Sequence, residues 1–141
     1  MAMLKSILLV EDDPFLIDIY SQKFKKSGFE IRAAETADKA FEMIKEKIPD
    51  LILLDIVLPQ IDGWSILKKM KADKALSEVK IIVFSNLGQK EEVEKGLNLG
   101  AVKYLIKAQY TPLEVVKEVS NLLGSRLQGQ ADKAKPELTD V

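Results

Sequence analysis

The chain contains no cysteine and no histidine among its 141 residues. The lack of cysteine excludes disulfide bonds and a thiol nucleophile. The two absences together exclude Cys/His zinc sites, Ser-His-Asp triads and phosphohistidine chemistry on this chain. A metal ion would need oxygen ligands, which favours a hard cation such as magnesium or calcium. Any chemistry must therefore come from carboxylates, lysine, hydroxyl groups or the backbone.

Charge of one sign is not in excess, because 21 Lys and Arg residues are balanced by 22 Asp and Glu residues. We therefore expect no direct nucleic acid binding. No apolar run approaches the length of a membrane span, and the N-terminal segment MAMLKSILLVEDD turns acidic after a very short apolar run. These features predict a cytoplasmic protein without a signal peptide and without membrane insertion.

The composition predicts one folded domain followed by a polar tail. Apolar residues make up 47% of the chain, which is enough for a core, and aromatic residues only 6%, so the core should be mostly aliphatic. We place the domain at residues 5–124. Residues 125–141, SRLQGQADKAKPELTDV, are polar and show no sustained apolar period. They are predicted to form a flexible C-terminal tail.

Short apolar runs alternate with longer amphipathic segments. The predicted strands are Ile7–Val10, Glu30–Ala34, Leu51–Leu54, Lys80–Ser85 and Tyr104–Lys107, and the predicted helices are Pro14–Ser27, Thr36–Lys47, Gly63–Lys71, Gln89–Leu99 and Pro112–Leu123. This alternation predicts an α/β fold: a doubly wound, five-stranded parallel sheet with five helices on its two faces. Ligand sites of such sheets lie beyond the carboxyl ends of the strands.

Polar side chains stand at four of these five strand ends. The first strand is followed by three acids and the third by one acid, while the fourth and fifth end in a hydroxyl and an ammonium: Glu11, Asp12, Asp13, Asp55, Ser85 and Lys107. Two like charges about 4 Å apart repel by about 4 kcal/mol at an effective dielectric of about 20, so grouped carboxylates need a cation. Lys107 and Mg²⁺ would supply it. This set predicts phosphoryl chemistry, with Asp55 either a metal ligand only or also the nucleophile.

Each of these residues also has an ordinary structural interpretation. An Asp after a strand is usually a turn residue or helix cap, Glu-Asp-Asp-Pro suits the acidic first turn of a helix, and a lone Lys is usually a solvated charge. The functional interpretation is favoured because four strand ends bring matching chemistry to one edge of the sheet.

Four segments occur in an order and spacing that resemble the receiver domain of two-component response regulators: ILLVEDDP, DLILLDIVLPQIDG, IIVFS and YLIK. The resemblance covers about residues 5–123. It implies a CheY-like, flavodoxin-like sheet with strand order 2-1-3-4-5. It also implies that the chain is not an enzyme with a separate substrate, because a receiver catalyses phosphoryl transfer to itself and hydrolysis from itself only.

The resemblance implies roles for individual residues. Asp55 is similar to the phosphoacceptor, Lys107 to the phosphate-binding lysine, Ser85 to the switch hydroxyl and Tyr104 to the switch aromatic, although Tyr104 would also suit a simple core position. Asp13 falls one position beyond the acidic pair and is expected to begin the first helix. The implied Mg²⁺ ligands are Asp12, Asp55, the Val57 backbone carbonyl and, through water, Glu11.

The implied function is that of a stand-alone response regulator receiver. A histidine kinase or histidine phosphotransfer protein would supply the phosphoryl group from phosphohistidine. A downstream protein target would bind the surface formed by the fourth helix, fifth strand and fifth helix. A phosphorylation-dependent homodimer is a further partner that the resemblance allows. Two alternatives stay open: a degenerate receiver that binds partners independently of phosphate, and a receiver fragment of a longer regulator or hybrid kinase.

Two positions depart from the family pattern. Ala108 follows Lys107 where the family usually has a proline with a cis bond, which predicts either a trans bond with a reshaped loop or a retained cis bond. Asn86 follows Ser85 where the family prefers Ala or Gly, and its side chain could crowd the phosphoryl site or donate a hydrogen bond to it.

A rival class of protein is the haloacid-dehalogenase-like phosphatases, which also use an Asp nucleophile after a strand. These enzymes need a second acid two residues after that Asp. Val57 holds this position, so the sequence argues against the rival class.

Overall fold

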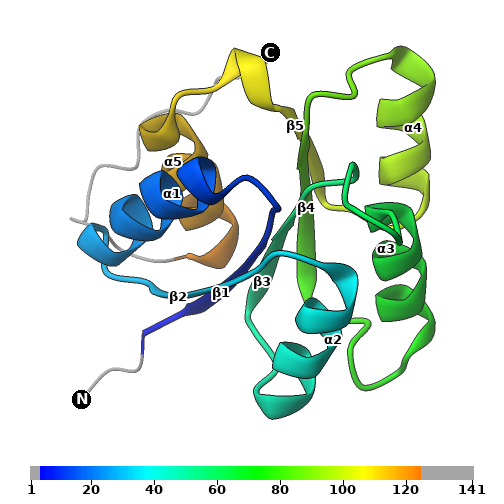
Figure 1. Ribbon diagram of the computed structural model, residues 1–141, viewed down its shortest axis with the longest axis horizontal. Helices are drawn as coiled ribbons and strands as arrows, with labels where there is room; N and C mark the ends of the chain where they lie inside the picture. The colour runs from blue at the N-terminus through cyan, green and yellow to red at the C-terminus, as the bar shows by residue number, and fades with distance from the viewer. Residues whose placement is uncertain (1–3, 125–141) are drawn as a thin grey trace.

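Five parallel strands form one sheet in the order β2-β1-β3-β4-β5 (Figure 1). The computed structural model describes residues 4–124, and the predicted tail lies outside the described residues. The strands are β1 Ser6–Val10, β2 Glu30–Ala34, β3 Leu51–Leu54, β4 Lys80–Ser85 and β5 Lys103–Ile106. The helices are α1 Pro14–Lys26, α2 Ala37–Glu46, α3 Gly63–Ala72, α4 Lys90–Asn98 and α5 Pro112–Leu123. The predicted fold class and strand order are confirmed.

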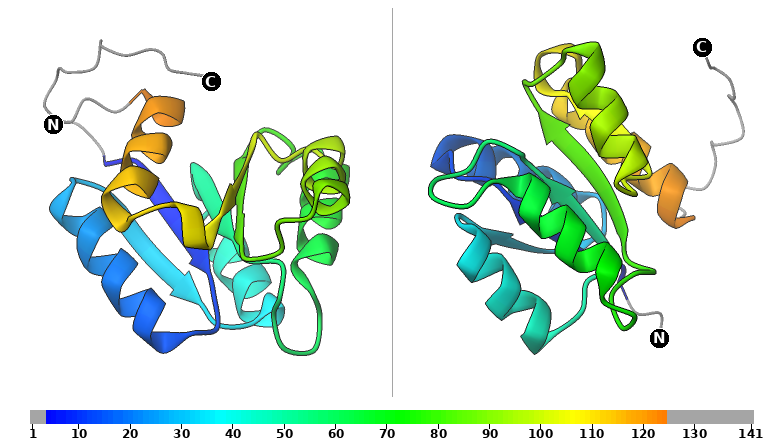
Figure 2. Two further views of the ribbon diagram at one scale, coloured as in Figure 1. Left: turned by 90° about the horizontal axis from the view of Figure 1, so that it is seen from above. Right: turned by 90° about the vertical axis from the view of Figure 1, so that its right-hand side faces the viewer.

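The helices cover both faces of the sheet, which explains why the central strands are apolar without alternation (Figures 1 and 2). In β1, Ile7 and Leu9 join a core that includes side chains of α1 and α5, whereas Leu8 and Val10 join a second core with side chains of α2 and α3. Because successive side chains of a strand point to opposite faces, both faces of β1 need apolar residues.

The end of β5 differs from the prediction. The sequence pattern predicts that Lys107 belongs to the strand, but β5 ends at Ile106 and Lys107 begins a 3-10 turn, Lys107–Gln109. The turn begins directly after the last strand residue in the sequence YLIK, so the apolar pattern does not show where the strand ends. Lys107 is therefore the first residue after the strand, as Asp55 is after β3.

None of the helices within residues 4–124 is long and apolar enough to cross a membrane.

Candidate functional site

Three carboxylates meet at the carboxyl edge of the central strands. Glu11, Asp12 and Asp55 place one carboxylate oxygen each within 4.8 Å of one another. The sheet produces this proximity, because β1 and β3 are paired up to Val10 and Leu54, the residues just before these acids. Glu11 and Asp55 are only 1% and 5% exposed, whereas Asp12 is exposed. The cluster thus has two buried acids and one that faces water.

Lys107 bridges the two buried acids. Its Nζ lies 2.6 Å from Glu11 Oε1 and 2.8 Å from Asp55 Oδ2. The ammonium also lies 5.7 Å from the centre of the Phe84 ring, a distance compatible with a cation–π contact. One cation therefore partly neutralises two carboxylates that follow directly after neighbouring strands.

The pKa values of Glu11 and Lys107 reflect both burial and pairing. Burial raises the pKa of the Glu11 carboxyl above its ordinary value, and the ion pair with Lys107 only partly opposes this. For Lys107, burial lowers the pKa, but the close contacts with the Asp55 and Glu11 carboxylates outweigh it and raise the pKa above its ordinary value. Lys107 therefore stays charged at neutral pH, and its positive charge offsets the negative charge of the buried Glu11 and Asp55 carboxylates.

The donor set fits a hard divalent cation. All three clustered side chains offer carboxylate oxygens, which Mg²⁺ and Ca²⁺ prefer. Glu11 Oε1 is buried, and its close contact with Lys107 lacks hydrogen-bond geometry, so this oxygen has no proper donor among the described residues. Such an acceptor suits a water molecule on a metal ion. The Val57 carbonyl stays a predicted ligand, and the Val57 N–H donates to Asp55 Oδ1 at 3.1 Å.

Asp13, the third acid after β1, has a structural role. It is the N-cap of α1, and its Oδ1 accepts a hydrogen bond from the Phe15 N–H at 2.9 Å. Its expected place at the start of the first helix is confirmed. Gly63 likewise begins α3, as expected, and its N–H donates to the Ile56 carbonyl at 2.8 Å.

Ser85 and Tyr104 are connected through Leu87 rather than through Asp55. The buried Ser85 hydroxyl accepts a hydrogen bond from the Leu87 N–H at 3.3 Å, and the Tyr104 hydroxyl donates to the Leu87 carbonyl at 2.5 Å. The Tyr104 ring lies against α4, where a Cβ on Gly96 would come within 2.8 Å of Cδ2. Burial raises the pKa of Tyr104 to about 12, so its hydroxyl stays protonated at neutral pH.

The two departures from the family pattern meet each other in space. The Lys107–Ala108 peptide is trans, as in the first of the two alternatives, and the loop forms the 3-10 turn described above. Asn86 Oδ1 accepts a hydrogen bond from the Ala108 N–H at 3.2 Å. This oxygen therefore accepts a hydrogen bond from the neighbouring loop. The sequence suggested that Asn86 would crowd the phosphoryl site or donate a hydrogen bond to it, and did not predict this contact.

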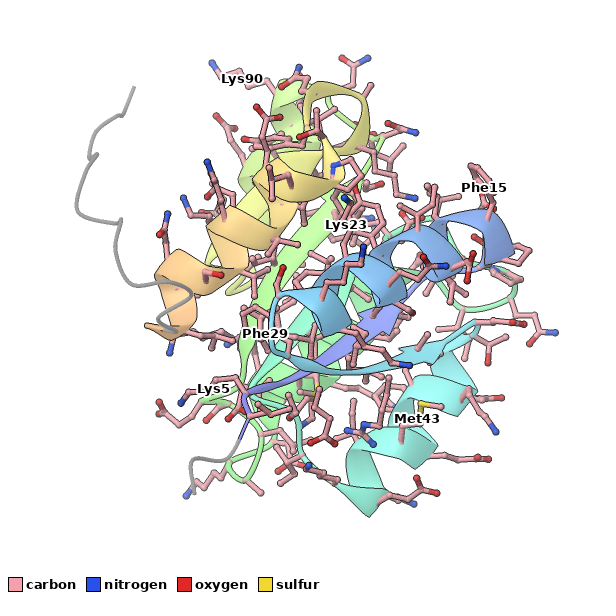
Figure 3. All side chains as sticks on the ribbon, turned by 90° about the vertical axis from the view of Figure 1, so that its left-hand side faces the viewer. Lys5, Phe15, Lys23, Phe29, Met43 and Lys90 are labelled. Atoms are coloured by element: carbon pink, nitrogen blue, oxygen red, sulfur yellow. The ribbon has the colours of Figure 1, made fainter. Side chains whose placement is uncertain are left out.

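An apolar rim near the acidic cluster was not predicted. Phe15, Val57 and Leu113 are 69%, 57% and 55% exposed, and each lies just beyond the carboxyl edge of the sheet, in α1, the β3–α3 loop and α5. Figure 3 shows the Phe15 side chain projecting outward from the start of α1. Because isolated apolar residues resemble core residues in a sequence, no pattern identified these three.

Comparisons with known proteins give a consistent result. Residues 7–119 match the family model of the response regulator receiver domain. The phosphate regulon transcriptional regulatory protein PhoB of Pseudomonas aeruginosa is 30% identical over 132 residues, which cover 94% of this chain and 56% of PhoB. The DNA-binding dual master transcriptional regulator RpaA of Synechocystis is 30% identical over 101 residues, covering 72% of this chain and 42% of RpaA. The chain thus spans about half the length of these relatives.

A solved structure of a CheY-like receiver domain protein from Methanospirillum hungatei is similar in fold and sequence. It superposes with a TM-score of 0.79 and 30% identity, and the match covers 86% of this chain and 95% of the other.

Proposed function

The chain belongs to the response regulator receiver domain family, and on this premise we propose that it accepts a phosphoryl group on Asp55. The observation that carries the proposal is the buried Asp55 carboxylate, grouped with Glu11 and Asp12 and contacted by Lys107 at 2.8 Å. The family is one of receiver domains rather than of enzymes. Catalysis would therefore be limited to phosphoryl transfer to, and hydrolysis from, Asp55 itself.

Asp55 acts as the nucleophile in this proposal. One of its oxygens attacks the phosphorus of a phosphohistidine on the donor protein, the P–N bond breaks with its electron pair going to the imidazole nitrogen, and an aspartyl phosphate forms. Lys107 Nζ, already beside Asp55 Oδ2, donates to an oxygen of the transferred group. Water later hydrolyses the aspartyl phosphate.

The switch would begin at Ser85. Its oxygen accepts from the Leu87 N–H, so its hydroxyl hydrogen is left to donate to a phosphoryl oxygen. A movement of Ser85 toward that group would shift Leu87, whose carbonyl holds the Tyr104 hydroxyl. The surface of α4, β5 and α5 would then change, by a shift between two states of the protein.

Magnesium is the proposed cofactor. Asp12, Asp55 and the Val57 carbonyl would hold it directly, and Glu11 would hold it through water. Bound there, it would neutralise negative charge on the phosphoryl oxygens during transfer. Support comes from the all-oxygen donor set and from the buried Glu11 Oε1 that lacks a hydrogen-bond donor.

The proposed partners are a histidine kinase or histidine phosphotransfer protein and a downstream protein target. The exposed apolar rim of Phe15, Val57 and Leu113 offers a docking surface for the phosphohistidine donor. The α4-β5-α5 surface would bind the target or a second phosphorylated copy. We propose a cytoplasmic receiver without nucleic acid contacts of its own, acting by itself or as the receiver part of a longer regulator, as in the longer relatives.

The deciding experiment is intact mass spectrometry after incubation with phosphoramidate and Mg²⁺. We expect one added phosphoryl group that depends on Mg²⁺ and is absent in Asp55→Asn. Asp18→Asn is the matched control, because Asp18 is exposed on α1 and outside the acidic cluster. If no adduct forms although Mg²⁺ binding is verified and a second donor is tried, the phosphate-independent binding receiver becomes the better interpretation.

Magnesium is also expected to stabilise the folded chain before any phosphorylation. A ligand at ten times its Kd that binds only the folded state raises the free energy of unfolding by about 1.4 kcal/mol. Urea unfolding with and without Mg²⁺ should show this increase in the wild type and in Asp18→Asn. It should be lost in Asp12→Asn, which removes the exposed carboxylate of the cluster. An equal increase in Asp12→Asn would place the ion elsewhere.

A further inference from the structure

The hydrogen bond between the Asn86 side chain and the Ala108 main chain joins the two loops that begin at Ser85 and Lys107. Asn86 Oδ1 accepts it from the Ala108 N–H at 3.2 Å. Asn86 follows β4 directly, and Ala108 lies in the 3-10 turn after β5. The Ala108 N–H belongs to the peptide that begins at the Lys107 carbonyl. The bond therefore holds the backbone from which the Lys107 side chain departs.

This bond extends the pairing of β4 with β5 beyond its last residue pair. The strands pair as far as Ser85 and Ile106. Beyond Ser85 the strand has ended, and the side-chain oxygen of Asn86 serves as an acceptor for the next part of the neighbouring chain. Alanine or glycine at this position would have no such oxygen.

Lys107 needs a well-defined backbone position because its ammonium must contact two carboxylates at the same time. Nζ reaches Glu11 Oε1 at 2.6 Å and Asp55 Oδ2 at 2.8 Å, and these acids follow two different strands. The four-carbon stem of lysine is flexible, so the position of its backbone limits where the ammonium can lie. A misplacement of about 1 Å in a catalytic group can slow a reaction by up to about 100-fold.

We propose that Asn86 is a positioning residue for phosphoryl transfer and acts through Lys107, by holding the Lys107–Ala108 peptide. The inference rests on the proposed function, since it assigns a further residue to the same reaction. Among the described residues Asn86 makes no hydrogen bond to Asp55, whereas Lys107 does, and this difference separates a positioning role from the role of Lys107.

The kinetic test is a cycle of substitutions, read by the rate of phosphorylation by phosphoramidate and Mg²⁺. Asn86→Ala removes the acceptor, and Lys107→Met removes the ammonium that the bond is proposed to position. We expect Asn86→Ala to slow the reaction about fivefold, as loss of one neutral hydrogen bond suggests. Combining them should slow it no further than the slower single variant. Asn121→Ala, an exposed position near the end of α5, is the matched control and should leave the rate unchanged.

A second measurement does not depend on phosphorylation. Hydrogen exchange of the Ala108 amide should be about fivefold faster in Asn86→Ala than in the wild type. Asn86→Asp keeps an acceptor oxygen and should keep the protection. Urea unfolding of each variant separates a local effect from a general loss of stability, which would speed the exchange of many amides.

The outcomes separate this inference from the proposed function. Two results would overturn the role of Asn86 and leave the proposed function intact. One is unchanged Ala108 exchange in Asn86→Ala, and the other is an equal slowing by Asn86→Ala with and without Lys107→Met. If the wild type and every variant take up no phosphoryl group, the proposed function fails and the kinetic role of Asn86 fails with it. The exchange data would then still establish whether the bond between the loops exists.

Discussion

Lys107→Met is expected to lower the free energy of unfolding at pH 7 by about 2–3 kcal/mol and to slow phosphorylation by about 100-fold or more. The ammonium has close contacts with Glu11 and Asp55, whose side chains are only 2% and 7% exposed. Removing it leaves two buried carboxylates without their cation. We place the stability loss below the usual range for fully buried pairs because the Lys107 side chain is itself 13% exposed, so the pairs are not completely desolvated.

The loss of stability should depend on pH. The pKa of Lys107 is raised, so its stabilising charge is fully present below its ordinary pKa and is lost only as the pH rises through the raised value. The pKa of Glu11 is raised by burial, so its contribution to stability is greatest at low pH and is lost as the pH rises through that value. Without Lys107 this loss grows. The deficit of Lys107→Met should therefore be larger at pH 7 than at pH 5.

Urea unfolding at the two pH values, without divalent ions, measures this difference. The matched control is Lys103→Met, because Lys103 pairs with Glu118 at 3.1 Å on the surface, with its side chain 41% exposed. That variant should lose less than about 1 kcal/mol. Equal deficits for the two variants would contradict the view that Lys107 compensates buried charge.

Gly63→Ala is expected to destabilise the protein by about 1–3 kcal/mol and to slow phosphorylation at least tenfold. A Cβ at this position would meet the Asp55 carbonyl oxygen and would lie 2.7 Å from Ile56 Cα. Both atoms belong to the backbone that carries the proposed phosphoacceptor, so no side-chain rotation can relieve the overlap. The substitution must move either the start of α3 or Asp55 itself.

Gly88→Ala is the control for this prediction. The atoms nearest to its Cβ would belong to the Ile106 side chain, the closest at 3.0 Å, and that side chain can adjust. We expect less than about 1 kcal/mol of destabilisation and less than a twofold change in rate. Phosphorylation kinetics and urea unfolding of the two variants give the comparison. A wild-type rate in Gly63→Ala would show that Asp55 tolerates displacement of its backbone.

The local pattern of residues was sufficient to predict the architecture. Runs such as Leu51–Leu54 identified strands buried on both faces, and the amphipathic segments between them identified the helices. The parallel arrangement requires that residues after the strands share one edge, so the sequence alone places Glu11, Asp55 and Lys107 together. The strand order came from resemblance to a family, because periodicity carries no information about which strands are neighbours.

The contacts within the site required the folded structure. That Lys107 reaches both Glu11 and Asp55, that Tyr104 binds the Leu87 carbonyl, and that Asn86 accepts from Ala108 all depend on side-chain rotamers and on the paths of two loops. Each contact joins residues far apart in the chain, so no local spacing encodes it. Periodicity specifies which face of an element is apolar, whereas the direction of a polar side chain beyond the end of a strand is set by the atoms that surround it.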